Sequence, residues 1–117
     1  MTWLLPIRVV NTANRREHWA VKAKRNAAHR RAVGLVLGTG VYPAPPLPVV
    51  VTLTRIAPKA FDFDGTVVSM KAVRDQVAAH YGVDDGPKEK RIQWEYAERR
   101  GAVREYAVEI EIVGVTT

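Results

Sequence analysis

The chain has 117 residues, of which 47% are hydrophobic and 26% are charged, so we expect one domain over residues 1–117 with a single core. It contains no cysteine, which excludes disulfide bonds and thiolate metal sites. No apolar run approaches the roughly 18 residues of a membrane span, and the first residues lack the basic and apolar parts of a secretory signal. We therefore expect a cytoplasmic protein that does not engage a membrane.

The positive charge is concentrated in one segment. Lysine and arginine number 18 against 12 acids, a net charge of +6. Seven of these basic residues and a single acid, Glu17, lie between Arg15 and Arg31, which leaves eleven of each elsewhere. A localised basic segment favours a polyanionic partner such as nucleic acid more strongly than a uniformly basic surface does.

The first third of the chain predicts a strand followed by a long helix. Trp3–Val10 has the composition of a strand, in which Pro6 indicates an edge position or a bend. Residues 11–14 form a turn that supplies helix N-cap side chains. From Arg15 to Leu37 the pattern is helical and rich in alanine, and it ends at Gly38-Thr39-Gly40.

This predicted helix carries a basic face beside an apolar one. At helical spacing the basic face presents Arg15, His18, Lys22, Arg25 and His29. The neighbouring apolar face presents Trp19, Ala20, Ala23 and Ala27. Acids that would pair with these cations at i,i+4 are almost absent. We therefore interpret the basic face, together with Arg16, as contacts for phosphates, and a solvated helix surface is the alternative.

The middle of the chain predicts a central strand, an acidic loop and a second helix. Val49–Ile56 is continuous and rich in β-branched residues, which is typical of a strand buried on both faces. The loop over residues 57–65 carries Asp62 and Asp64. A helix from about Thr66 to Tyr81 follows, and its apolar side belongs to the core.

The C-terminal part predicts a second acidic loop and two strands. The loop Gly82–Lys90 contains Asp84 and Asp85. Arg91–Glu98 and Val103–Val113 alternate in hydrophobicity on either side of a turn, which indicates a β-hairpin around Arg99-Arg100-Gly101. The order strand, helix, strand, helix, strand, strand predicts an α+β fold, with one mixed sheet backed by two helices.

Two pairs of aspartates are the candidate metal ligands. Asp62 and Asp64 precede the second predicted helix, and Asp84 and Asp85 follow it. Carboxylates gathered in one place repel each other unless a cation or a proton compensates their charge. Mg²⁺ prefers hard oxygen ligands, so two or three aspartates with a phosphate oxygen suit it. The alternative is that these are ordinary loop aspartates, one of which caps a helix.

The order of these pieces resembles the RusA family of Holliday-junction resolvases. In that family an Asp-x-Asp-Asn loop enters a helix with an essential lysine, and a Gly-Val-x-Asp-Asp-like segment follows. Here the central strand is followed by Asp62-x-Asp64, by Lys71-Ala-Val-Arg-Asp75 and by Gly82-Val83-Asp84-Asp85. Val10-Asn11-Thr12 followed by Trp19 also resembles the family's Asn-x-x-Trp-like start, so the resemblance covers nearly the full chain.

The resemblance implies a Mg²⁺-dependent endodeoxyribonuclease that resolves four-way DNA junctions as a homodimer, by paired symmetric nicks. It implies that Asp62, Asp64 and Asp85 bind Mg²⁺, with Asp84 as the alternative to Asp85. Lys71 would then contact the scissile phosphate or the charge that develops on it; a plain helix salt bridge to Asp75 is the alternative.

The chain departs from the family pattern at two points. Gly65 stands where many members have Asn, and the gap from Asp64 to Lys71 is about one helical turn longer. A non-catalytic nucleic-acid-binding or phage-derived module of the same fold is therefore a second hypothesis.

A third hypothesis comes from a competing motif. Residues 61–67 read Phe-Asp-Phe-Asp-Gly-Thr-Val, which is also similar to the motif that opens haloacid-dehalogenase-like phosphatases. Only 51 residues follow Thr66, too few for the larger sheet that such an enzyme needs.

Overall fold

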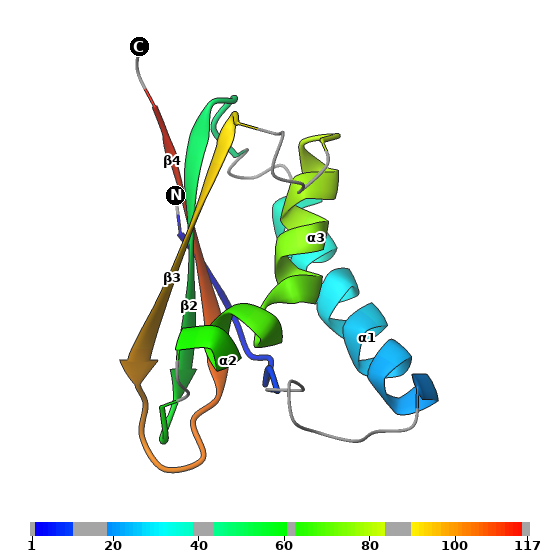
Figure 1. Ribbon diagram of the computed structural model, residues 1–117, viewed down its shortest axis with the longest axis vertical. Helices are drawn as coiled ribbons and strands as arrows, with labels where there is room; N and C mark the ends of the chain where they lie inside the picture. The colour runs from blue at the N-terminus through cyan, green and yellow to red at the C-terminus, as the bar shows by residue number, and fades with distance from the viewer. Residues whose placement is uncertain (1, 11–18, 39–43, 61–62, 84–89, 116–117) are drawn as a thin grey trace.

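The computed structural model describes residues 2–10, 19–38, 44–60, 63–83 and 90–115, and within these ranges it has four strands and three helices. In chain order they are β1 (Thr2–Leu5), α1 (Trp19–Gly38), β2 (Val49–Ala57), α2 (Phe63–Ser69), α3 (Lys71–His80), β3 (Ile92–Arg100) and β4 (Ala107–Gly114). The strands form one mixed sheet, and all three helices lie on the same side of it (Figure 1). The predicted α+β class with a mixed sheet is confirmed. None of the helices in these ranges is long and apolar enough to cross a bilayer.

β2 lies inside the sheet, as its sequence predicted. The strand order is β1-β4-β2-β3, with β2 antiparallel to β4 and parallel to β3. On the face toward the helices, Val49, Val51 and Leu53 are buried in the main core. On the other face Thr54 and Ile56 are also buried, by 92% and 95%. A continuous run of β-branched residues suits this position because one face of the strand lies in the core, and the other is buried at Thr54 and Ile56 and half-buried at Val50 and Thr52.

The predicted hairpin of the last two strands is wrong. β3 pairs in parallel with β2, and β4 pairs with β2 and with β1, so β2 lies between β3 and β4. Alternating hydrophobicity had predicted both strands, but this pattern does not depend on which strand lies alongside. The turn 99–101 also lacks the two-residue Asn-Gly or Asp-Gly sequence that fixes a tight hairpin.

The second predicted helix is two helices. It begins at Phe63 instead of Thr66, and it breaks at Met70, whose side chain is fully buried. The Ser69 hydroxyl donates a hydrogen bond of 2.8 Å to the Thr66 carbonyl, a contact that often bends a helix. The break makes Lys71 the first residue of α3 and turns α2 across the lower part of the sheet (Figure 1).

Only the second half of α1 carries buried side chains. Its buried side chains are His29, Val33 and Leu37, whereas Trp19, expected on the apolar face, is 76% exposed. Ala20, Ala23 and Ala27 are exposed as well, so the predicted apolar face is wrong for the first half of the helix. The reason is length: at 1.5 Å per residue α1 is about twice as long as α3, against which it packs, and its first turns extend past α3 and away from the sheet (Figure 1).

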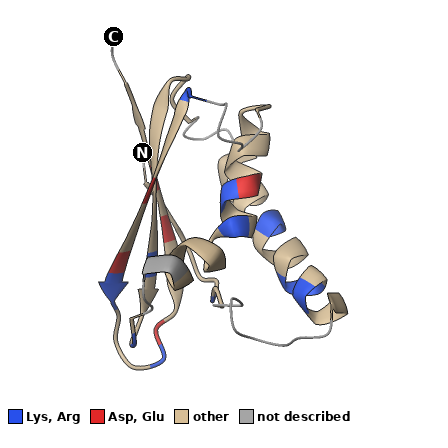
Figure 2. Ribbon diagram, viewed as in Figure 1, with Lys and Arg blue, Asp and Glu red and all other residues tan. Residues whose placement is uncertain are grey.

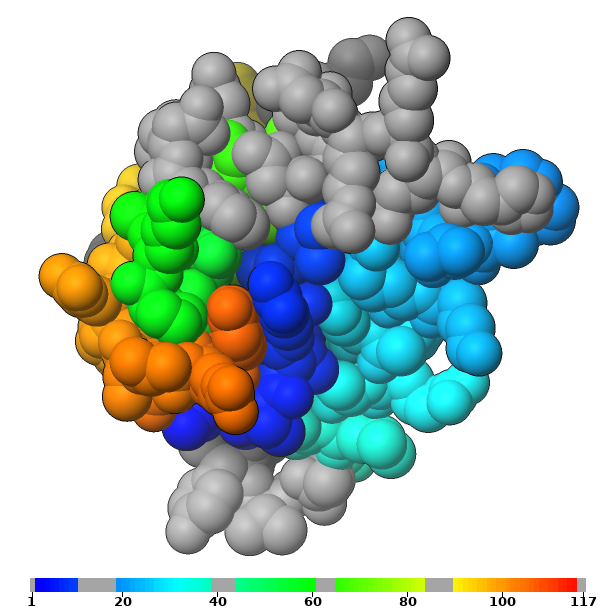
Figure 3. Space-filling view, turned by 90° about the horizontal axis from the view of Figure 1, so that it is seen from below, coloured from blue at the N-terminus to red at the C-terminus, as the bar shows by residue number. Residues whose placement is uncertain are grey.

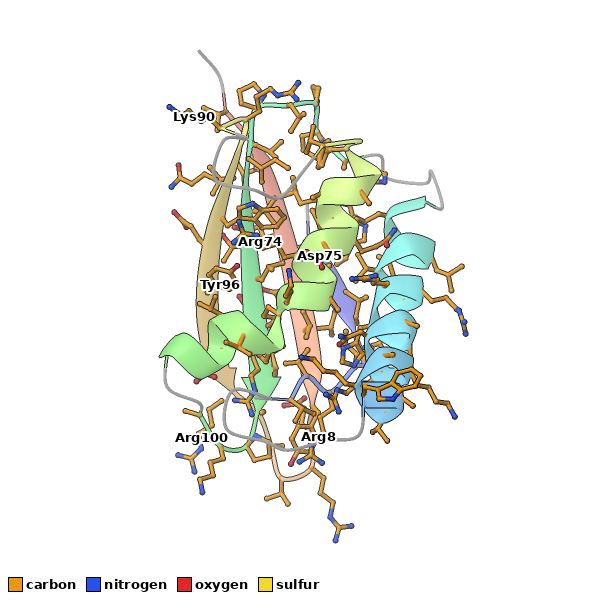
Figure 4. The ribbon with its side chains drawn as sticks, turned by 45° about the vertical axis from the view of Figure 1, so that its right-hand side comes forward. Arg8, Arg74, Asp75, Lys90, Tyr96 and Arg100 are labelled. Carbon is orange, nitrogen blue, oxygen red and sulfur yellow. The ribbon has the colours of Figure 1, made fainter. Side chains whose placement is uncertain are left out.

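β1 is shorter than predicted, and its edge position is confirmed. It ends at Leu5 instead of Val10, directly before Pro6, and it pairs with β4. On the opposite edge, Arg74 of α3 packs on β3. The Arg74 guanidinium lies 4.7 Å from the centre of the Trp94 ring and donates a 2.9 Å hydrogen bond to the Tyr96 hydroxyl (Figure 4).

The strand order can be tested with paired cysteines, since the chain has none of its own. Thr52 is the register partner of Glu95 on β3 and of Glu111 on β4. A variant with Thr52→Cys and Glu95→Cys should form a disulfide on mild oxidation, seen by mass spectrometry under non-reducing conditions. In the control, Glu95→Cys with Glu111→Cys, two strand spacings of about 4.8 Å separate the cysteines, which exceeds the reach of a disulfide. A cross-link in the control alone would contradict the strand order.

Candidate functional site

Several predicted site residues lie outside the described ranges. These are Asp62, Asp84, Asp85, Arg15, Arg16 and His18. The backbone of Asp64 lies in the first turn of α2, and its side chain is not described. The expected convergence of Asp62, Asp64 and Asp85 therefore falls outside the described residues. Among the residues that are described, no group of three or more His, Asp or Glu side chains could hold a metal ion.

The remaining predicted residues line one small pocket. It has a volume of about 70 Å³ and lies between α1 and the corner where α2 meets α3. Its lining residues are Val10, Lys22, Arg25, Asn26, His29, Val68, Ser69, Lys71 and Ala72. Lys22, Arg25 and His29 come from the predicted basic face, and Lys71 comes from the segment that resembles the resolvase helix. The break at Met70 allows this meeting, because it places Lys71 at the start of α3. We call it the α1–α3 pocket.

The α1–α3 pocket is electropositive. Among the residues that the structure describes, its lining includes three cationic side chains, Lys22, Arg25 and Lys71, and no acid. The Lys71 side chain is 76% exposed, and its ammonium lies 3.5 Å from a carboxylate oxygen of Asp75 one turn along the helix, a weak surface pair. The first turn of α3 has no acidic residue, so the positive end of its helix dipole adds to the field. The chemistry of this arrangement suits an anion.

His29 lies at the inner side of the α1–α3 pocket and is only 7% exposed. Burial lowers the pKa of His29 below its ordinary value of 6.5, and the nearby Arg25 guanidinium lowers it further. A hydrogen bond with the backbone of Arg8 acts in the opposite direction. His29 is therefore a neutral, largely buried residue at pH 7, unlike Lys22 on the same helix, which is exposed.

A second, larger pocket lies at the carboxyl ends of β2 and β3. It has a volume of about 390 Å³ and is lined by Arg55, Ala57, Pro58, Lys59, Ala60, Glu98, Arg99 and Arg100. We call it the strand-end pocket. The sequence analysis did not identify any of these residues as part of a functional site. One signal was available: Arg55 is the only charged residue in the otherwise uncharged strand Val49–Ile56, and a charge within a buried strand requires a partner.

The strand-end pocket is lined by the ends of β2 and β3, and the α1–α3 pocket by α1 and by the corner between α2 and α3. Seen from below, α2 and the loop after β3 lie on one side of the first ten residues, and α1 lies on the other (Figure 3). Lysine and arginine mark the ends of β2 and β3 and the lower part of α1 (Figure 2). α2 has seven residues and so is about 10 Å long; Val68 and Ser69 near its end line the α1–α3 pocket, and its Thr66 contacts Glu98 of the strand-end pocket.

Comparisons with known proteins do not assign this chain to a family. A scan against protein-family models finds no match, and a search of curated proteins finds no significant match.

The burial of His29 makes stability depend on pH. Because its pKa is lower in the folded state, the unfolded state takes up a proton first as the pH falls below 6.5. Its contribution is therefore complete above pH 6.5 and is lost progressively as the pH falls toward the lowered pKa. Urea unfolding at pH 7.5 and at pH 5.5 should show a smaller loss of stability for His29→Gln than for the wild type. The same substitution at the exposed His80 is the control, and an equal loss in wild type and His29→Gln would contradict the assignment.

Proposed function

We propose that this protein is a Mg²⁺-dependent endodeoxyribonuclease that acts on four-way junctions or other branched DNA. The observation that carries the proposal is the α1–α3 pocket, in which Lys22 and Arg25 of the basic helix meet Lys71 of the resolvase-like segment. Two features that the sequence placed about fifty residues apart thus share one anion-favouring surface. This supports a common role for them at a nucleic-acid backbone, because phosphates dominate the affinity of such interfaces.

In the proposed mechanism the cations bind the DNA strand, and the aspartates bind the metal ion. Lys22 and Arg25 contact phosphates and fix the position of the backbone. Lys71 contacts the scissile phosphate or the charge that develops on it. Asp62, Asp64 and Asp85, or Asp84 in place of Asp85, supply the hard oxygen donors that suit Mg²⁺. When bound, this ion polarises the phosphate and lowers the pKa of the attacking water.

The same proposal includes a homodimer in the cytoplasm. A four-way junction has two-fold symmetry, so two symmetric nicks require two sites related by a two-fold axis. An isologous dimer provides this relation. The readout of DNA would be directed mainly at its branched structure, since phosphate contacts carry no sequence information.

The phosphatase hypothesis is less well supported by the fold. It requires the first aspartate of the motif at the very end of a parallel strand. β2 ends at Ala57, five residues before Asp62, and the sheet contains one parallel pair among the described strands. The non-catalytic binding module keeps its place as the second candidate, because Gly65 departs from the resolvase pattern.

Cleavage of a synthetic four-way junction tests the enzyme. Wild-type protein should nick it with Mg²⁺ and not with EDTA. Asp62→Asn and Asp64→Asn keep the side-chain shape but remove anionic metal ligands, so cleavage should fall by a factor on the order of 10² or more. Binding to the junction, measured by gel shift, should persist in both variants. Near wild-type cleavage by either variant would contradict the ligand assignment, and binding without any cleavage by the wild type would favour the non-catalytic module.

The salt dependence of DNA binding tests the α1–α3 pocket. Each lost phosphate contact lowers the slope of log K against log salt concentration by about 0.9, so Lys22→Gln with Arg25→Gln should lower it by about 1.8. Lys71→Gln alone should lower it by about 0.9. A matched control is Lys24→Gln with Arg31→Gln, which removes two exposed cations of α1 that do not line the pocket. Equal slopes for the two double variants would mean that the basic face is an ordinary solvated helix surface and not a phosphate-binding one.

A further inference from the structure

The strand-end pocket is built on a fixed floor. Because β2 and β3 are parallel, their carboxyl ends lie together, which is where open α/β sheets usually bind ligands. The Gly101 amide donates a 2.9 Å hydrogen bond to the Ala57 carbonyl and ties the two strand ends to each other. The floor is therefore part of the sheet and not of a separate loop.

A buried arginine and its partners form the wall of this pocket. The Arg55 side chain is 7% exposed, and its guanidinium donates to the Lys59 carbonyl at 2.8 Å and to the Glu98 carboxylate at 3.0 Å. The same oxygen of Glu98 accepts a 2.9 Å hydrogen bond from the Thr66 hydroxyl of α2. Arg55 is thus neutralised by Glu98, and the network fixes the loop after β2 and α2 against β3. Such a network holds the pocket in one shape before any ligand arrives.

The rim of the pocket carries an excess of positive charge. Of its five charged lining residues within the described part of the chain, four are cations and one, Glu98, is an acid. Arg99 is paired with Glu109 at 3.3 Å. Lys59 and Arg100 are exposed and have no carboxylate partner among the residues that the structure describes. Arg100 lies at the lower end of the sheet (Figure 4), at the tip of β3.

We propose that the strand-end pocket binds the phosphate group of a phosphomonoester, held between Lys59 and Arg100. A phosphomonoester carries close to two negative charges at pH 7, which matches these two cations, and arginine and lysine are the usual partners of phosphate oxygens. The volume of about 390 Å³ falls within the range of small-molecule sites, so it leaves space for an attached sugar against Ala57, Pro58 and Ala60. The inference goes beyond the nuclease proposal, because it requires neither Mg²⁺ nor cleavage.

An NMR titration with thymidine 5′-monophosphate in EDTA tests this site. We expect the amide signals of Lys59, Ala60 and residues 99–101 to shift together. Lys59→Gln and Arg100→Gln should each weaken binding about tenfold, the effect of losing one hydrogen bond to a charged group. Arg104→Gln is the matched control, since this arginine is exposed in the loop between β3 and β4 and does not line the pocket. The Arg104→Gln variant should bind the monophosphate within about twofold of the wild-type affinity. If the ligand were attracted only by the overall positive charge of this end of the protein, Arg104→Gln and Arg100→Gln would weaken binding alike.

Three further ligands identify what is bound. Thymidine without phosphate should not shift these signals, and inorganic phosphate should shift them with lower affinity because the apolar wall is unused. A 5′-phosphorylated thymidine tetranucleotide that binds more tightly than the monophosphate would assign the ligand to the end of a nucleic-acid strand, and equal binding would assign it to a free nucleotide or sugar phosphate. The proposal is overturned if thymidine shifts the same signals, if Arg104→Gln weakens binding as much as Arg100→Gln, or if the monophosphate leaves the pocket signals unchanged. Since EDTA removes divalent ions, these results do not depend on the nuclease activity.

Discussion

Because β3 pairs with β2 in parallel, the chain has to return from the carboxyl end of β2 to its amino end before β3 begins. α2 and α3 make that crossing, and they cover the inner face of the sheet on the way (Figure 1). β4 then takes the remaining edge of β2, and β1 closes the sheet beyond it. The parallel pairing therefore explains why α2 and α3 lie across one face of the sheet. It also explains why the ends of β2 and β3 meet.

The corner at Met70 has the largest consequence for the proposed site. A straight helix over the same residues would keep Lys71 in its interior, without a free helix N-terminus. The bend after Ser69 instead exposes the N-terminus of α3 beside α1, where Lys22 and Arg25 lie. An ion pair between Arg30 and Asp75, at 3.2 Å, joins the two helices above this point. A local hydrogen bond thus contributes to an arrangement of charges that spans α1 and α3.

Charge is handled differently in the two pockets. In the strand-end pocket Arg55 is desolvated, and removal of Glu98 would leave a buried charge uncompensated, a loss that costs roughly 3–5 kcal/mol in proteins. In the α1–α3 pocket the lysines remain exposed, and His29 avoids the problem by remaining neutral. The exposed cations are thus the ones that an anion can reach, and the buried arginine stabilises the frame that holds them.

The sequence by itself determined the elements whose signals are local. The β-branched run identified β2 to within one residue, Pro6 indicated an edge strand, and the segment from Arg15 to Arg31 contained the excess charge. Hydrophobic periodicity reports whether a side chain is buried, but it is the same whichever neighbour buries it. Only the tertiary structure could therefore decide that β3 lies beside β2, that the first half of α1 extends beyond the core, and that Lys71 meets the basic helix. The partner of Arg55 was beyond reach for the same reason, since Glu98 lies 43 residues away and becomes its neighbour through the parallel register.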